Sequence, residues 1–310
     1  MTEQMISRKL LKSQKKRAKT IELIFVSSFF VIPIINLIVF WLRSNLISLQ
    51  LVFQEMDELQ NTTWVGLANF EWFFKEIAKQ DSDILNGVAI SLFEYALGWL
   101  TFPITMMIAY WVYKKEPGTS AFRILSMLPA CVSGVLLGSM FLKFANNMTY
   151  LMKTFGIQNF PQLLVDTRTR FAMTMYYGIW QSYGMSTILY SNAMNRVDKE
   201  IIESAQLDGI TVWKEFWSIL FPMIFNTWSM GVVIGFSSIL TSNGPLYLFW
   251  EFNAPRDTIR LGYLTYRMTM VNGAVDYPRV AVINLMGTAI VYPLTMFLKR
   301  YLEKVDPLGD

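Results

Sequence analysis

The sequence predicts an all-α integral membrane protein with about six transmembrane helices. Of its 310 residues, 16% are charged, against roughly 25% in soluble domains. Five apolar stretches contain no Asp, Glu, Lys or Arg: 23–42, 124–142, 171–193, 220–240 and 280–298. Each is about 20 residues long, which is the length an α-helix needs to cross ~30 Å of hydrocarbon. A sixth stretch, 88–113, contains only one charged residue, Glu94.

The predicted spans form one transmembrane domain, residues 21–302, without an internal repeat or a separate soluble domain. We expect them at about 21–42, 88–113, 122–142, 171–194, 220–241 and 280–298. A basic tail, 1–20, precedes the first span, and a short tail, 303–310, follows the last. The first apolar run is too long for the core of a signal peptide and no small-residue cleavage site follows it, so we expect an uncleaved helix.

The distribution of positive charge predicts the orientation. Segments 1–20, 114–123, 194–219 and 299–310 carry 16 Lys and Arg in 68 residues, whereas the alternate segments carry 11 in 109 residues. Short loops rich in Lys and Arg stay in the cytoplasm. Both termini are therefore predicted to be cytoplasmic.

Composition excludes several kinds of site. The chain has no histidine and one cysteine, Cys131, so it has neither imidazole-based catalysis nor a His-ligated or Cys-based metal site, and no internal disulfide. No G-x-x-x-x-G-K-[ST] loop is present to bind nucleotide phosphates. The sequence pI near 9 reflects basic membrane flanks rather than a nucleic-acid partner. We therefore expect a non-enzymatic chain that binds no cofactor, metal or nucleic acid.

Segment 195–219 is predicted to form two short helices on the cytoplasmic side. Asp198 is expected to cap the first helix, Gly209 to end it in a left-handed conformation, and Thr211 to cap the second. A narrow apolar stripe runs along the first helix: Val197, Ile201, Ile202 and Ala205. One interpretation is an amphipathic hairpin lying on lipid headgroups. The excess of acidic over basic residues fits a protein partner better.

This segment resembles the signature of binding-protein-dependent ABC permeases, E-A-A-x3-G-x9-I-x-L-P. The matching positions are Glu203, Ser204, Ala205, Gly209, Ile219 and Pro222. Ser204 replaces an alanine and Phe221 replaces the leucine. The longer pattern of sugar permeases is matched at further positions: Trp180, Gln181, Lys199, Glu200, Asp208, Trp213 and Phe216.

Other segments resemble the carbohydrate-uptake group of that family, the maltose and multiple-sugar permeases. Residues 63–70 are similar to a V-G-L-x-N-F segment after the first helix. Residues 127–129 are similar to an L-P pair, and residues 243–245 to an outer G-G-P. The resemblance therefore extends over most of the chain.

The resemblance implies a type I ABC importer permease fold in the plasma membrane of a prokaryote. Its partners would be a second homologous permease, two cytoplasmic ATPase subunits that bind ATP and Mg, and an extracytoplasmic solute-binding protein. The signature would form a coupling helix docked on an ATPase subunit. Its coupling residues would be Glu203, Ser204, Ala205, Asp208 and Gly209.

Sugar would pass along a path lined by aromatic and polar side chains. The candidates are Trp180, Tyr183, Trp228, Phe236, Asn284, Tyr292 and Glu94. Aromatic residues in membrane helices more often pack or lie at the interface. An ionisable residue inside a span is a functional hypothesis by default, although Glu94 could equally extend its carboxylate to the interface or bond at a subunit contact.

Three alternatives remain open at this point. A secondary transporter would need its own coupling carboxylate, for which only Glu94 is available. An ABC permease for a solute other than sugar would share the coupling segment. A channel or scaffold subunit is the third alternative, but the sequence contains no filter-like loop that would support it.

Overall fold

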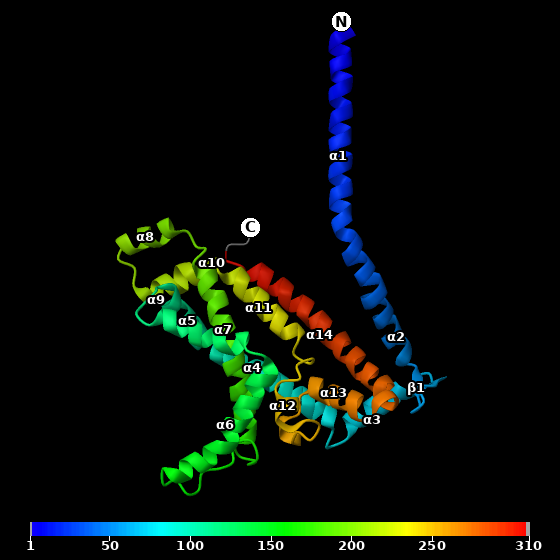
Figure 1. Ribbon diagram of the computed structural model, residues 1–310, viewed down its shortest axis with the longest axis vertical. Coiled ribbons are helices and arrows are strands. Elements are labelled where there is room, and N and C mark those ends of the chain that lie inside the picture. Colours follow the sequence, from blue (N-terminus) through cyan, green and yellow to red (C-terminus); the bar gives the residue numbers. More distant parts are fainter. Residues whose placement is uncertain (1, 308–310) are drawn as a thin grey trace.

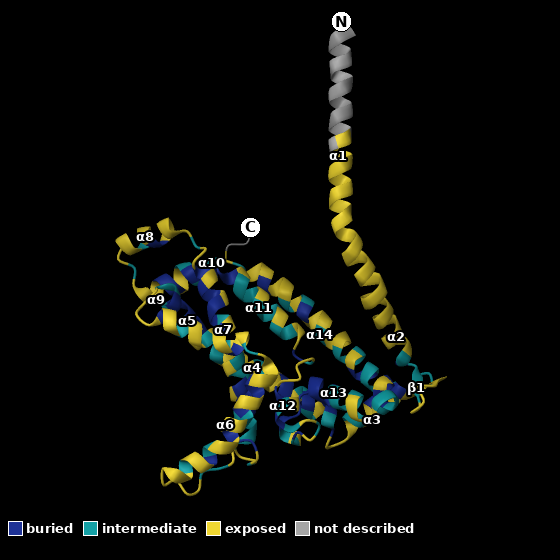
Figure 2. Cartoon of the chain, in the orientation of Figure 1, coloured by how far each residue is buried: buried dark blue, intermediate teal, exposed yellow. Residues whose placement is uncertain are grey.

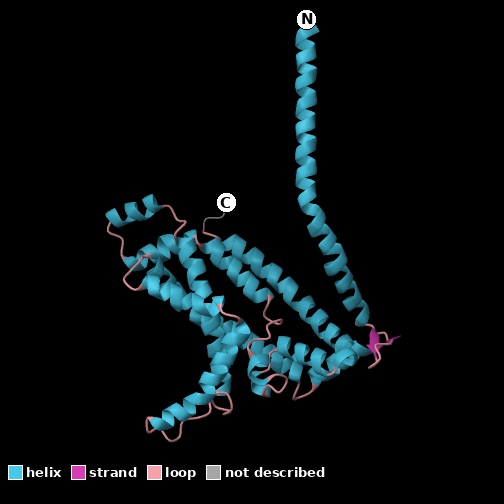
Figure 3. Cartoon of the chain, viewed as in Figure 1, coloured by secondary structure: helices cyan, strands magenta, loops and turns pink. Residues whose placement is uncertain are grey.

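The computed structural model describes the backbone of residues 2–307 and the side chains of 17 and 19–307. The described chain is helical except for loops and one antiparallel hairpin, β1 (Gln54–Met56) with β2 (Thr62–Trp64), which pairs Glu55 with Thr63 (Figure 3). The end of the C-terminal tail, 308–310, and the first residue of the basic tail lie outside the described residues.

Fourteen α-helices are described within residues 2–307. In chain order they are α1 (Thr2–Asn36), α2 (Arg43–Leu51), α3 (Ala68–Ala78), α4 (Asp83–Tyr113), α5 (Thr119–Cys131), α6 (Gly134–Thr154), α7 (Arg170–Met194), α8 (Lys199–Leu207), α9 (Val212–Glu215), α10 (Phe221–Met223), α11 (Phe225–Ser237), α12 (Leu246–Trp250), α13 (Leu261–Val271) and α14 (Tyr277–Val305). Two π-helical segments, Leu37–Leu42 and Phe216–Leu220, and two 3-10 segments, Arg256–Thr258 and Gly273–Asp276, connect some of them.

The first helix stands apart from the rest of the molecule (Figure 1). α1, the π segment and α2 form one helical rod, and its apolar window within Lys19–Leu51 has no buried residue. Only its α2 end contacts α14 and β1. A helix that is apolar on every side needs a covering of lipid or protein, and this chain does not supply one (Figure 2).

The all-α membrane fold is confirmed. Three helical stretches among the described residues are long and apolar enough to cross a bilayer: Lys19–Leu51, Asp83–Tyr113 and Gly273–Val305. Two bent pairs raise the number to five if each pair makes one span. α7 coincides with the expected span at 171–194 but carries more polar residues, and it packs between α4 and α5.

Two expected spans are broken rather than continuous. In the region of 122–142, α5 and α6 meet at 104°, because Val132 is extended and Ser133 is also non-helical just after Pro129. In the region of 220–241, the helical stretch that ends with α10 meets α11 at 67°. Pro222 lacks the amide that a regular helix needs there, and a π segment precedes it, both of which are recognised causes of kinks.

Close helix packing builds the centre of the bundle. A Cβ at Gly184 of α7 would lie 1.7 Å from the carbonyl oxygen of Ser126 in α5, so only glycine permits this approach. Closer to the 195–219 segment, one apolar cluster joins α4, α7 and the 212–224 region around Met106, Phe216 and Leu220. The 195–219 segment therefore packs directly against the end of the bundle.

Candidate functional site

The 195–219 segment projects from one end of the bundle, where α8 lies at the edge of the molecule (Figure 1). The predicted helix ends are confirmed. Asp198 Oδ1 accepts a hydrogen bond from the Glu200 amide at 3.2 Å, and Thr211 Oγ1 accepts one from the Lys214 amide at 3.4 Å. Both caps satisfy amides that the first helical turn leaves unpaired.

Gly209 terminates α8 in the left-handed conformation, with φ +74°. The amide of Ile210 donates to Ala205 O at 3.2 Å, and the amide of Gly209 donates to Gln206 O at 3.0 Å. These two bonds form a Schellman motif. A Cβ at Gly209 would meet nothing within 4 Å, so its surface is open to a partner.

The five predicted coupling residues lie together on this projecting element. Ile202 points inward and is buried, whereas Glu203, Ser204, Asp208 and Gly209 are exposed and Ala205 is half-buried. Leu207 is 90% exposed. The surface of α8 therefore combines an uncovered leucine, small residues and carboxylates.

A buried carboxylate, which the sequence analysis did not single out, connects this segment to α4. Glu215 is 2% exposed. Its Oε1 accepts from Tyr110 at 3.2 Å and lies 2.5 Å from Lys114 Nζ, both at the end of α4, and its Oε2 accepts from Gln206 of α8 at 3.2 Å. Three donors offset the cost of burying the charge. Glu215 thus connects α8 to the end of α4, in addition to the apolar cluster that includes Ile202.

The seven path candidates do not form one group. Glu94 and Tyr183 line a cavity of ≈ 240 Å³ between α4 and α7. Asn284 and Tyr292 line a second cavity, the larger of these two at ≈ 470 Å³, beside α13 and α14. The others lie in aromatic contacts: Trp228 with Trp99 and Phe102, Phe236 with Tyr95, and Trp180 with Phe141.

Glu94 has a specific partner. Its carboxylate accepts from Arg260 Nε, and Arg260 Nη2 donates to Glu94 Oε1 at 2.8 Å. Arg260 is fully buried although it lies in a predicted outer loop, and its Nη1 has no hydrogen-bond partner among the described residues. Gly244, at φ +56°, packs on the guanidinium, and a Cβ there would lie 2.1 Å from Nη1. The sequence signal for this pair was Glu94 itself, because a lone carboxylate inside a span needs a partner. Nothing in the sequence identified Arg260 as that partner.

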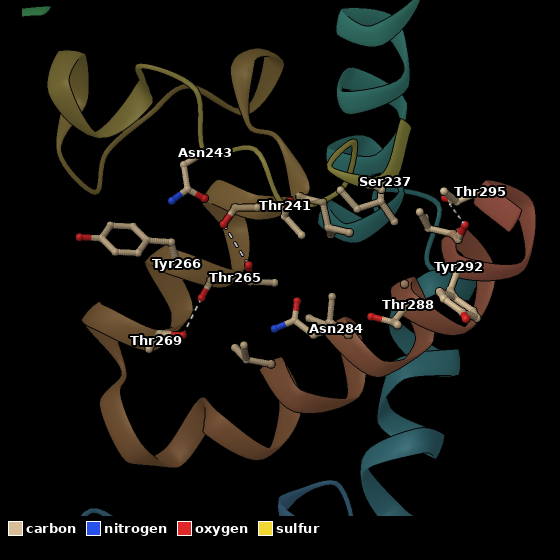
Figure 4. A pocket seen from close by; sticks show the side chains of 17 residues that line it. Ser237, Thr241, Asn243, Thr265, Tyr266, Thr269, Asn284, Thr288, Tyr292 and Thr295 are labelled. Atoms are coloured by element: carbon tan, nitrogen blue, oxygen red, sulfur yellow. Dashed lines mark hydrogen bonds between the residues drawn. The ribbon is translucent and has the colours of Figure 1, made fainter. Parts of the chain in front are cut away.

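Ten of the 17 residues that line the larger cavity have uncharged polar side chains, set among apolar ones (Figure 4). On α14 these residues are Asn284, Thr288, Tyr292 and Thr295, spaced at intervals of three or four. This spacing puts them on one face of the helix. A polar stripe at helical period within an apolar span is the signal that would have identified the cavity from the sequence.

No protein-family model matches the sequence. The sn-glycerol-3-phosphate transport system permease protein UgpA of Brucella abortus is 25% identical over 271 residues, which cover 86% of this chain and 89% of that protein. The multiple sugar-binding transport system permease protein MsmF of Streptococcus mutans is 23% identical over 250 residues, covering 78% and 86%. The glucose import system permease protein GlcT of Saccharolobus solfataricus is 22% identical over 254 residues, covering 78% and 85%.

The fold is similar to that of a solved bacterial ABC transporter involved in importing the acidic polysaccharide alginate. The TM-score is 0.74 at 19% identity, over 91% of this chain and 96% of that chain. A second structure of an alginate transporter, in complex with an alginate pentasaccharide-bound periplasmic protein, gives the same TM-score over 94% and 99%.

Proposed function

The chain is a permease of the ABC importer type, as its signature predicted, and from this premise we propose that it forms half of a translocation path for a sugar or oligosaccharide. A second homologous permease forms the other half. The observation that carries the proposal is the exposed, capped 195–219 segment, fixed to the transmembrane bundle through Glu215. The chain itself is a transport component rather than an enzyme.

In this proposal α8 docks on a cytoplasmic ATPase subunit. Glu203 pairs with a basic residue of that subunit, the small side chains of Ser204 and Ala205 allow close approach, and Gly209 provides the turn. ATP and Mg bind the two ATPase subunits and not this chain. When those subunits close, Glu215 transmits the displacement of α8 to α4, and the permeases move as rigid bodies.

The exposed first helix supports the second permease as a partner. Its apolar surface lies away from the rest of this chain, and a homologous subunit covering one side of it would leave the other side for lipid. The complex would lie in the plasma membrane of a prokaryote with both termini in the cytoplasm, as the charge distribution favours.

A carbohydrate cargo is supported by the names of several relatives, which include multiple-sugar and glucose import systems. An extracytoplasmic binding protein would deliver it, as the complex of the alginate transporter with its periplasmic protein suggests by analogy. The relatives named for sn-glycerol-3-phosphate support a non-sugar solute as the second candidate.

The test combines recovery of the ATPase with uptake. A tagged chain is isolated from its host in mild detergent, and saccharide uptake is compared between cells with and without the chain. We expect an ATPase subunit to be recovered with the tagged chain, and uptake of at least one saccharide to require it.

The Glu203→Lys variant should lose both ATPase recovery and uptake while its amount in the membrane is unchanged. Glu116→Lys, in the exposed loop after α4, is the matched control and should retain both. Normal ATPase recovery and uptake by Glu203→Lys would contradict the docking role. Saccharide uptake that does not depend on the chain would contradict the cargo class.

A further inference from the structure

The larger cavity lies between three helices and has the size of a small-molecule site. It is bounded by the end of α11, the 240–243 segment, α13 and α14. Its volume of ≈ 470 Å³ falls within the range of small-molecule sites. Asn284 projects from α14 toward α13, and Thr265 and Thr269 face it from α13 (Figure 4).

Most hydroxyl protons around this cavity are already committed to the backbone. Five of the six Ser and Thr hydroxyls donate to carbonyl oxygens three or four residues earlier, at 2.7–3.0 Å: Ser237, Thr241, Thr265, Thr269 and Thr295. A hydroxyl that donates in this way still has lone pairs available. These five hydroxyls therefore offer a ligand acceptors.

The remaining polar groups are neutral. Thr288, Asn243 and Asn284 make no described side-chain hydrogen bond and are exposed to the cavity or its opening. Tyr266 and Tyr292 add aromatic surface. No Asp, Glu, Lys or Arg is among the described lining residues. A phosphate or uronate would find the neutral donors of Asn243, Asn284 and Thr288 but no counter-charge, and a cation would find no carboxylate, so neither charge would be neutralised.

Lipid is a poor covering for this surface. Asn284, Thr288 and Tyr292 lie within the candidate span Gly273–Val305, and unpaired amides are costly in hydrocarbon. Lipid therefore leaves these polar groups unpaired, whereas water or a polar solute pairs them. Molecules that carry many hydroxyl donors and no charge meet all these conditions.

We propose that this cavity is a solute subsite that selects uncharged, hydroxyl-rich saccharide units and rejects anionic ones. The proposal rests on the proposed function and makes it more specific. Ligand hydroxyls donate to the threonine oxygens, the Asn284 amide donates to and accepts from the ligand, and a sugar face packs on Tyr266 or Tyr292. Relatives and structural neighbours whose names specify glycerol phosphate or an acidic polysaccharide would need a different lining here.

Cysteine labelling tests this subsite in the assembled importer. Cys131, the only cysteine, is replaced by alanine, and Asn284→Cys is introduced. A charged, membrane-impermeant thiol reagent is then applied to the purified complex in nanodiscs. The probes are glucose, maltose and maltotriose as neutral saccharides, and glycerol 3-phosphate and trigalacturonate as anionic solutes. We expect labelling, slowed at least about fivefold by a neutral saccharide and not by an anionic solute.

Absence of labelling would show that lipid or protein covers the cavity and would overturn the proposal. The proposal would also be overturned if no neutral saccharide slowed labelling, including a saccharide that the cells import. Stronger protection by an anionic solute than by a neutral saccharide would overturn it as well. These results would leave the proposed function intact when uptake and ATPase recovery remain normal.

A second measurement avoids dependence on cysteine. Thr288→Val removes a hydroxyl with almost no change of shape, and we expect the KM for uptake of the neutral cargo to rise about fivefold, as loss of one hydrogen bond predicts. Thr154→Val, at an exposed hydroxyl that donates to Tyr150 O at 3.1 Å far from the cavity, is the matched control. An unchanged KM for Thr288→Val would count against the subsite.

Discussion

The 195–219 segment and the larger cavity are built in opposite ways. The segment is 25 consecutive residues whose caps and turn are satisfied within a few positions, as at Asp198 and Gly209. The cavity collects side chains from Ser237 to Thr295 across three helices. The proposed docking segment can therefore be recognised from a local pattern, whereas the proposed solute subsite depends on how distant helices pack.

Two glutamates show how far tertiary contacts reach. Glu215 is buried in a network that joins Gln206, nine residues away, to Tyr110 and Lys114 at the end of α4. Glu94 depends on Arg260, 166 residues away in sequence. Both avoid the cost of an isolated buried charge, but only the first lies in a segment whose importance the sequence motif indicated.

The largest expected effect is at the turn of the coupling segment. Gly209→Asp should reduce uptake by about a hundredfold, because it adds a charged side chain to an open docking surface and loss of a binding hot spot costs about 2–3 kcal/mol. The measurement is uptake normalised to the amount of chain in the membrane. Gly156→Asp is the control, since Gly156 also has positive φ and open space around its Cα. Equal loss in both variants would mean that backbone strain, rather than docking, explains the result.

An intermediate effect is expected at the Glu94–Arg260 pair. Glu94→Gln leaves the buried guanidinium without its counter-charge, at a cost of about 3 kcal/mol, so the amount of folded chain and its thermal midpoint in detergent should fall. The double variant Glu94→Leu with Arg260→Leu should recover part of both, and Glu116→Gln should change neither. Normal stability with lost uptake would instead assign Glu94 to the solute path. Normal stability and uptake would fit a carboxylate that only reaches toward the interface.

The smallest effect is expected at Trp180. Its ring packs on Phe141 at 6.3 Å between centroids, and it lines neither cavity. Trp180→Phe keeps an aromatic ring, so the KM for uptake should change by less than about twofold. A tenfold increase would extend the solute path to the α6–α7 contact and weaken the contrast between a local segment and one cavity built from distant helices.

The larger part of the fold was predictable because membrane spans follow from composition. The length and apolar character of 88–113 and 280–298 required helices, and α4 and α14 extend beyond those limits at one or both ends. The breaks in the regions of 122–142 and 220–241 were not predicted. Pro129 and Pro222 lie at these breaks, but a proline alone does not specify an angle of 104° or 67°, which depends on what each half packs against.

The sequence by itself determined the membrane fold and the capped helix pair at 195–219, since apolar length, capping residues and glycine at a helix end act over a few residues. Only the tertiary structure decided which polar groups meet. It paired Glu94 with Arg260, separated Trp180 from the cavities, and aligned the α14 stripe with the threonines of α13. The physical reason is that hydrogen bonds and ion pairs act over a few ångströms, and residues distant in sequence come that close only after the helices have packed.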